Sequence, residues 1–159
     1  MMGGRKKQRC RLSKEPVKVG GSGVHGKGVF ATRYIRKGEC IIEYTGARIS
    51  WEKAQQLPPH DPKNPYHTVF FGLDDGDVIN PAVGGNEAQW INHSCDPNCE
   101  TAEEKGRIFV VARRDLKKGI ELFIDYRLEP AGRRTKKLES LFKCRCDSAK
   151  CRGTMLEPV

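Results

Sequence analysis

No stretch of this 159-residue chain approaches the roughly 20 consecutive apolar residues that a membrane-spanning helix needs. The N-terminus, residues 1–11, is basic, but the apolar core of a secretion signal does not follow it. We therefore expect no membrane partner, and a protein that stays in the compartment where it is made. A chain of this length is expected to fold as one domain.

Acidic residues are in the minority, with 20 Asp and Glu against 29 Lys and Arg and a net charge of +9. The cations gather at residues 5–9, 113–118 and 133–137. Such a surface favours polyanionic partners, including nucleic acid or chromatin. A solvated basic surface with a disordered N-terminal arm and no polyanionic partner explains the same charges, and the sequence alone leaves both interpretations open.

Helical periodicity is scarce, and the pattern predicts a mainly β fold of many short strands. A short helix is expected from Ser50, a favourable N-cap, to about Leu57, before Pro58 and Pro59 stop it. Helical turns are expected at residues 88–91 and 138–142. The strands are expected at residues 17–31 around a glycine-rich turn, 40–44, 66–73, 78–79, 99–103, 107–112 and 122–124.

One internal similarity is visible. Residues 35–44 and 116–126 each contain a Lys-Gly turn, then a hydrophobic strand, an acid and a tyrosine. The tyrosines, Tyr44 and Tyr126, therefore lie at strand ends, where side chains commonly enter functional sites. Chance similarity between two turn-and-strand units explains the same pattern.

The seven cysteines are an odd number, which argues against a complete disulfide framework and favours a reducing compartment. Cys144, Cys146 and Cys151 have C-x-C-x4-C spacing, one ligand short of the four that a structural zinc site takes. The segment 92–99 can supply the fourth. Three unrelated surface thiols are the alternative. We interpret Cys10, Cys40 and Cys99 as free thiols.

Three further features carry little information alone. Residues 92–98 (NHSCDPN) form a dense polar segment, in which His93 could be a purely structural histidine. Gly26-Lys27-Gly28 lets the backbone approach a ligand closely, but no clear helix follows it, so a dinucleotide loop is disfavoured. Tyr126 offers a phenol for catalysis or simply fills the edge of the core.

Together these segments resemble the SET-domain protein-lysine methyltransferases, in the order of that family. The matching segments are residues 25–29 (HGKGV), 43–46 (EYTG), 90–98 (WINHSCDPN), 119–126 (GIELFIDY) and 144–153 (CRCDSAKCRG). They span about residues 17 to 156, and five motifs in order make the resemblance specific.

The resemblance implies a mainly β, β-clip-like fold of small sheets with a C-terminal pseudoknot and a zinc-bound post-SET tail. It implies a catalytic SET domain at 16–127 and a post-SET segment at 144–159. The polar, basic and aperiodic composition predicts a disordered arm at 1–15, and a polar linker is expected at 128–143. The resemblance also implies S-adenosylmethionine as methyl donor and a lysine as acceptor, in a histone tail or a similar basic segment.

Residue roles follow from the same resemblance. Tyr126 would be the catalytic tyrosine and Tyr44 would line the lysine channel. The donor would be bound by Gly26, Lys27, Gly28, Val29, Asn92 and His93, with Met155 or Leu156 covering its adenine. One structural Zn²⁺ would be bound by Cys95, Cys144, Cys146 and Cys151.

Several positions depart from the family pattern. Ala47 replaces an acid that often follows E-Y-x-G, and Gln89 replaces an arginine that often precedes the aromatic residue. Ile124 lies where the family often has Tyr or Phe, and its lack of a hydroxyl predicts capacity beyond monomethylation. Only Cys10 lies before residue 25, so the chain looks like a minimal, stand-alone member, as in bacteria or viruses.

Two other classes of function remain open at this point. A non-catalytic SET-fold binding module would retain the fold without turnover, although the intact Asn92, His93 and Tyr126 argue against it. A zinc-stabilised nucleic-acid-binding protein fits the charge and the cysteines but leaves residues 92–98 and 119–126 unexplained. The enzyme would act in a reducing intracellular compartment, including the nucleus and its chromatin, of its own cell or of a host. The sequence does not identify the oligomeric state.

Overall fold

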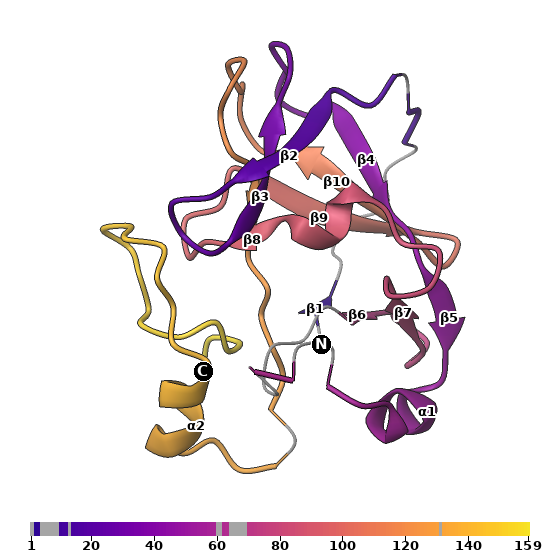
Figure 1. Ribbon diagram of the computed structural model, residues 1–159, viewed down its shortest axis with the longest axis vertical. Coiled ribbons are helices and arrows are strands. Elements are labelled where there is room, and N and C mark those ends of the chain that lie inside the picture. The colour runs from indigo at the N-terminus through magenta and orange to yellow at the C-terminus, as the bar shows by residue number, and fades with distance from the viewer. Residues whose placement is uncertain (1, 4–9, 13, 60–61, 64–69, 131) are drawn as a thin grey trace.

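The chain forms several small sheets rather than one large one (Figure 1). The computed structural model describes residues 2–3, 10–12, 14–59, 62–63, 70–130 and 132–159. The strands are β1 (Met2–Gly3), β2 (Val17–Gly21), β3 (Lys27–Ala31), β4 (Cys40–Tyr44), β5 (Ala47–Ile49), β6 (Phe71–Gly72), β7 (Val78–Asn80), β8 (Asn92–His93), β9 (Cys99–Glu104), β10 (Arg107–Ala112) and β11 (Phe123–Ile124). The helices are α1 (Trp51–Gln56), the 3₁₀ helix η1 (Glu87–Trp90) and α2 (Lys136–Leu141).

The strands pair into four sheets, which confirms the predicted mainly β class. Their orders are β1-β6-β7-β5, β4-β10-β9, β11-β8 and β2-β3. Buried aliphatic and aromatic side chains from β3, β4, β10 and β11 share one hydrophobic core. Of the strand expected at 66–73, the described part forms β6, and residues 64–69 lie outside the described residues. No helix in the described ranges combines the length and apolar character of a membrane span.

The internal similarity is a structural repeat. Residues 32–39 and 113–120, here called the paired turns, lie against each other, and Ile35 and Leu116 exchange backbone hydrogen bonds of 2.9 and 2.8 Å. The Gly38 N–H donates to Ala112 O and the Gly119 N–H donates to Ala31 O, each at 2.8 Å. Both glycines have φ near +90°, which other residues rarely adopt. The first turn is therefore bonded to the end of β10, the strand that precedes the second turn. The second turn is bonded to the end of β3, the strand that precedes the first turn.

The described N-terminal residues contact two of the sheets. Met2–Gly3 pairs in parallel with β6. Cys10 forms a disulfide with Cys40, with their Cα atoms 5.5 Å apart, so the prediction that these two are free thiols is wrong. The Cys10 N–H donates to Glu104 Oε2 at 3.0 Å, which places this segment beside the β4-β10-β9 sheet. Cys99 is a free, buried thiol, as predicted.

Two distant segments meet where β8 pairs in parallel with β11, Asn92 opposite Phe123 and His93 opposite Ile124. This is the contact that the predicted pseudoknot requires. The buried Asn98 side chain extends the pairing, because its Nδ2 donates to Glu121 O and its Oδ1 accepts from the Phe123 N–H, both at 2.8 Å. The amide thus acts as one more peptide group against β11.

Asn98→Ala should lower the free energy of unfolding by about 2–4 kcal/mol, because two buried backbone groups lose their partner. Urea unfolding followed by circular dichroism measures this. Lys117→Ala, at an exposed position on one of the paired turns, is the control and should change stability little. A loss below 1 kcal/mol in Asn98→Ala would contradict this account of the pairing.

Candidate active site

Asn92 is held in place from three sides. Its Nδ2 donates to Lys27 O at 2.8 Å, to Glu121 Oε1 at 3.0 Å and to His25 O at 3.3 Å. Gly28 makes room for this arrangement, because a Cβ there would lie 2.2 Å from Glu121 Oε1. The Gly26-Lys27-Gly28 segment and β8 are thereby joined through one side chain.

His93 follows on β8 and is buried. Its Nδ1 accepts the Tyr126 N–H at 3.0 Å, so the neutral ring carries its proton on Nε2, which lies 3.4 Å from Cys95 Sγ. Burial lowers the pKa of His93 to about 4, against the opposing effect of Asp125 at 3.6 Å. A neutral His93 therefore fixes the backbone at Tyr126 while contacting the cysteine cluster.

Tyr126 and Tyr44 are both buried, and burial raises the pKa of each phenol above its ordinary value. The Tyr126 hydroxyl donates to Ile91 O at 2.6 Å. The Tyr44 ring packs on Phe71 with ring centroids 5.3 Å apart. Burial and, to a smaller extent, the neighbouring charge of Tyr126 raise the pKa of Tyr44. The two tyrosines of the repeat therefore belong to one hydrophobic core, in protonated form.

A cavity of about 450 Å³ opens beside these residues. One wall carries His25, Asn92, His93 and Tyr126, and the other is formed by α2 and the C-terminal tail. The tail side is lined by Ser140, Leu141, Lys143, Arg145 and Met155. Sequence reasoning assigned residues 128–143 to a linker and did not predict their part in the cavity. Leu138, Leu141 and Phe142, spaced as one helix face, were the available signal.

The remaining predicted donor-binding residues lie in two different surroundings. Gly26 and Lys27 line a smaller cavity of about 180 Å³ together with Asn92, Trp90 and Tyr126, and Lys27 Nζ lies 4.5 Å from the Trp90 ring centre. Val29 is fully buried, and its carbonyl accepts the Leu122 N–H at 2.8 Å. Leu156 is also in the core, and its neighbour Met155 is the residue that lines the larger cavity.

The four cysteines predicted to bind metal come together: the Sγ atoms of Cys95, Cys144, Cys146 and Cys151 all lie within 4.8 Å of one another. A tetrahedral zinc with bonds of about 2.3 Å places its sulfurs about 3.8 Å apart, and Cys95 and Cys144 Sγ are 3.7 Å apart. Backbone N–H groups of Arg152, Cys146 and Gly153 donate to three of the sulfurs. The donor set and its spacing fit zinc.

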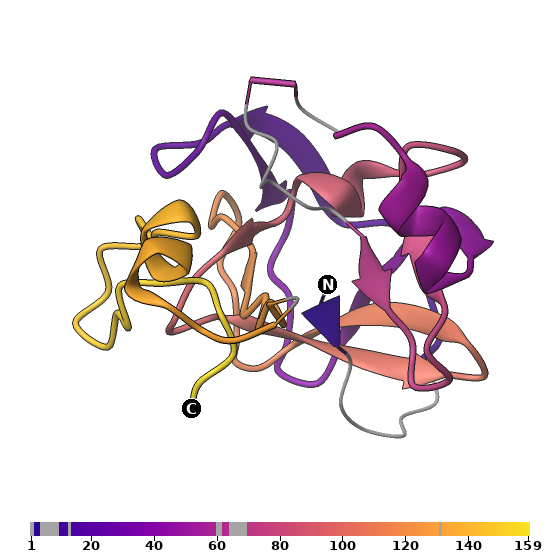
Figure 2. The same ribbon diagram turned by 90° about the horizontal axis from the view of Figure 1, so that it is seen from below.

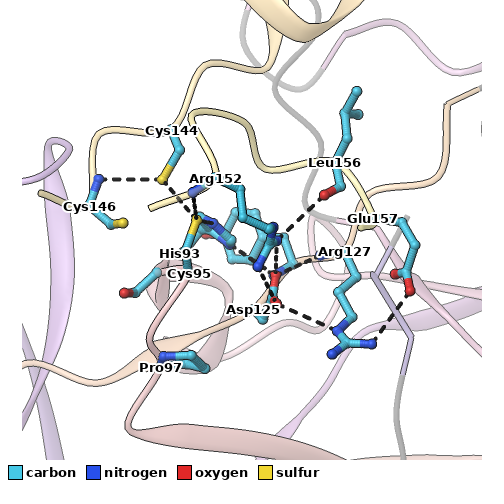
Figure 3. A network of polar contacts seen from close by, with 12 residues as sticks. His93, Cys95, Pro97, Asp125, Arg127, Cys144, Cys146, Arg152, Leu156 and Glu157 are labelled. Carbon is cyan, nitrogen blue, oxygen red and sulfur yellow. Dashed lines mark hydrogen bonds and ion pairs between the residues drawn. The ribbon is translucent and has the colours of Figure 1, made fainter. Parts of the chain in front are cut away.

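An ion pair joins the tail to the end of β11 (Figure 3). Arg152 donates to both carboxylate oxygens of Asp125, at 2.9 and 2.8 Å. Arg127 lies 3.5 Å from the same carboxylate and 3.4 Å from Glu157. The backbone continues this contact, because Leu128 and Leu156 pair in parallel. Sequence reasoning did not predict this ion pair, since nothing in the sequence joins Asp125 to Arg152.

Comparison with known proteins agrees with this geometry. The family model described as SET domain matches residues 26–127. Histone-lysine N-methyltransferase 2B of Homo sapiens is 35% identical over 146 residues, which are 89% of this chain and 5% of that protein.

Fungal relatives show a similar identity to this chain. Histone-lysine N-methyltransferases described as H3 lysine-4 specific, from Candida albicans and Saccharomyces cerevisiae, are each 35% identical over 88% of this chain and 14% and 13% of their own lengths. The chain thus spans a small part of the curated relatives it matches. Since the family model covers well over half of the chain, and His25, Asn92, His93 and Tyr126 from its motifs line one cavity, the chain belongs to the SET-domain family.

Proposed function

We propose that the chain is a protein-lysine N-methyltransferase that uses S-adenosylmethionine and acts on a histone tail. The observation that carries the proposal is the meeting of Asn92, His93 and Tyr126 in the wall of one cavity, within a SET domain. The relatives described as H3 lysine-4 specific make lysine 4 of histone H3 the first substrate to test. Such a substrate implies action at chromatin in the nucleus.

The residues present fit the donor. A volume of about 450 Å³ is in the range of cavities that hold small ligands. When bound, the donor supplies a methyl group on a positively charged sulfur. His25, Asn92 and His93 would hold it from the β8 side, and Met155 offers a flexible apolar cover from the tail. Gly26 and Lys27 would bind it through the backbone.

The acceptor lysine needs a dry channel more than a strong base. A free lysine has a pKa of about 10.4 and must lose its proton before it can attack. Burial among Tyr44, Phe71 and Tyr126 would disfavour the ammonium and lower that pKa. The two tyrosines stay protonated, and the Tyr126 hydroxyl is fixed by its bond to Ile91 O. Positioning then does most of the catalytic work.

Zinc would be structural in this enzyme. The four sulfurs lie at the junction between Cys95, two residues after His93, and the tail that forms the second cavity wall. A bound ion would therefore hold the tail against the donor site. Ile124, paired with His93, stays the predicted determinant of a product beyond monomethyl-lysine.

Tyr126→Phe should reduce methyl transfer to a histone H3 peptide about a hundredfold while leaving donor binding nearly unchanged, because the lost hydroxyl is a positioned polar group at the reacting centre. Mass spectrometry measures transfer and methyl count, and calorimetry measures donor binding. Tyr34→Phe, on an exposed tyrosine, is the control. Undiminished transfer by Tyr126→Phe would rule out the catalytic role.

Gly28→Ala should weaken donor binding about tenfold, which is about 1.4 kcal/mol, because the new Cβ displaces the Glu121 carboxylate that holds Asn92. Gly21→Ala is the matched control, since nothing lies within 4 Å of a Cβ there. Calorimetric titration with S-adenosylmethionine compares the two variants. Equal affinities would show that Glu121 does not hold Asn92 for the donor.

The purified protein should contain one zinc ion per chain, measured by elemental mass spectrometry. Cys146→Ser should lose the metal, because Cys146 is one of the four clustered cysteines. Cys99→Ala should retain the metal, because Cys99 lies outside the cluster. Chelation should abolish transfer while most of the β-type circular dichroism remains. Full activity after verified removal of zinc would overturn the structural role of the ion.

A further inference from the structure

Among the described residues, the paired turns carry the largest group of cations outside the candidate active site. They carry seven cations against two acids, a net charge of +5 out of the +9 of the whole chain. The cations are Arg33, Arg36, Lys37, Arg113, Arg114, Lys117 and Lys118, and all seven are exposed. None of them takes part in the candidate active site.

The cations recur at matching positions of the repeat. Arg36 and Lys37 precede Gly38 as Lys117 and Lys118 precede Gly119, and the reciprocal hydrogen bonds of the two glycines set the turns in equivalent places. The structure therefore presents two similar basic turns side by side rather than one irregular basic loop.

Local acids neutralise only part of this charge. Glu39 pairs with Arg33, and Asp115 accepts the Lys37 N–H at 2.8 Å. Arg113 donates to Pro97 O at 3.2 Å. For the side chains of Arg36, Lys37, Arg114, Lys117 and Lys118, no ion pair joins them to a carboxylate of the described residues. Gathering such charges is unfavourable by itself, so an external polyanion would stabilise this surface.

The paired turns project from the end of the molecule opposite α1 and α2 (Figure 1). The view turned by 90° shows α2 and the tail together on one side, where they line the larger cavity (Figure 2). A partner on the paired turns would therefore leave the larger cavity free.

We propose that the paired turns bind the phosphate backbone of duplex DNA. Long cationic side chains on projecting turns are the groups that contact phosphates, and such contacts fix position without reading sequence. The two equivalent sets of cations suit a partner whose charges repeat along its length. This inference does not depend on the methyltransferase activity, although a histone substrate would place DNA beside the enzyme.

The test measures binding of a fluorescent 24-base-pair duplex by anisotropy across a series of salt concentrations. For about four phosphate contacts, the logarithm of affinity should fall against that of salt concentration with a slope of about −4. The test variant combines Arg36→Ala, Lys37→Ala, Lys117→Ala and Lys118→Ala. It should bind at least about tenfold more weakly at low salt, with a clearly shallower slope.

The matched control removes four exposed cations from other elements, by Lys18→Ala, Lys53→Ala, Lys136→Ala and Lys137→Ala. It has the same net charge and should bind within about twofold of wild type. A third variant, which exchanges Arg36 for Lys and Lys37, Lys117 and Lys118 for Arg, should retain binding. Thermal unfolding verifies that all variants fold.

Four outcomes would overturn the proposal. Equal weakening in the test and control variants would assign binding to net charge, and the absence of salt-dependent binding would show that the duplex is not bound through its phosphates. Tighter binding through these residues to vesicles of anionic phosphatidylserine would assign the surface to a membrane, and tighter binding to a poly-glutamate peptide would assign it to an acidic protein. Methyl transfer to a free histone peptide should be unchanged in the test variant, so a failure of this inference is distinguishable from a failure of the proposed activity.

Discussion

The parallel pairing of β8 with β11 is the contact on which the rest of the site depends. It puts His93 opposite Ile124, so that His93 Nδ1 accepts the N–H of Tyr126, two residues further along the chain. Asn98 lengthens the pairing with its side-chain amide. A pairing of two residues on each strand is weakly stable alone, and the buried side-chain hydrogen bonds add the stability that so few backbone hydrogen bonds cannot provide. The residues of the site are therefore also the residues that hold the fold together.

Local patterns in the sequence were enough to predict much of this arrangement. The C-x-C-x4-C spacing predicted a cysteine cluster, which forms, and the two Lys-Gly turns form a structural repeat. The role of the polar segment 92–98 followed only from the resemblance to the SET-domain family. The helix after Ser50 also forms, with the Ser50 hydroxyl accepting the Lys53 N–H. Such features are set by short-range geometry, which sequence reading captures well.

Contacts between distant segments were not predictable in the same way. The Cys10–Cys40 disulfide has no spacing signal, and an odd cysteine count pointed away from it. Asp125 and Arg152 meet only after the tail has docked. Met155 lines the cavity and Leu156 lies in the core, which depends on which face of one extended segment turns inward. The two residues are apolar neighbours, and no periodic pattern in the sequence shows which of them faces the cavity.

The two-sided construction of the larger cavity has a thermodynamic consequence. One wall comes from β8 and the end of β11, and the other from α2 and the tail that carries three of the four clustered cysteines. A ligand in the cavity and an ion on the sulfurs would both favour the docked tail over the undocked one. Linkage then requires that each strengthen the binding of the other by the same factor. Two chemically unrelated ligands that never touch would thus be positively cooperative through the position of a single polypeptide segment.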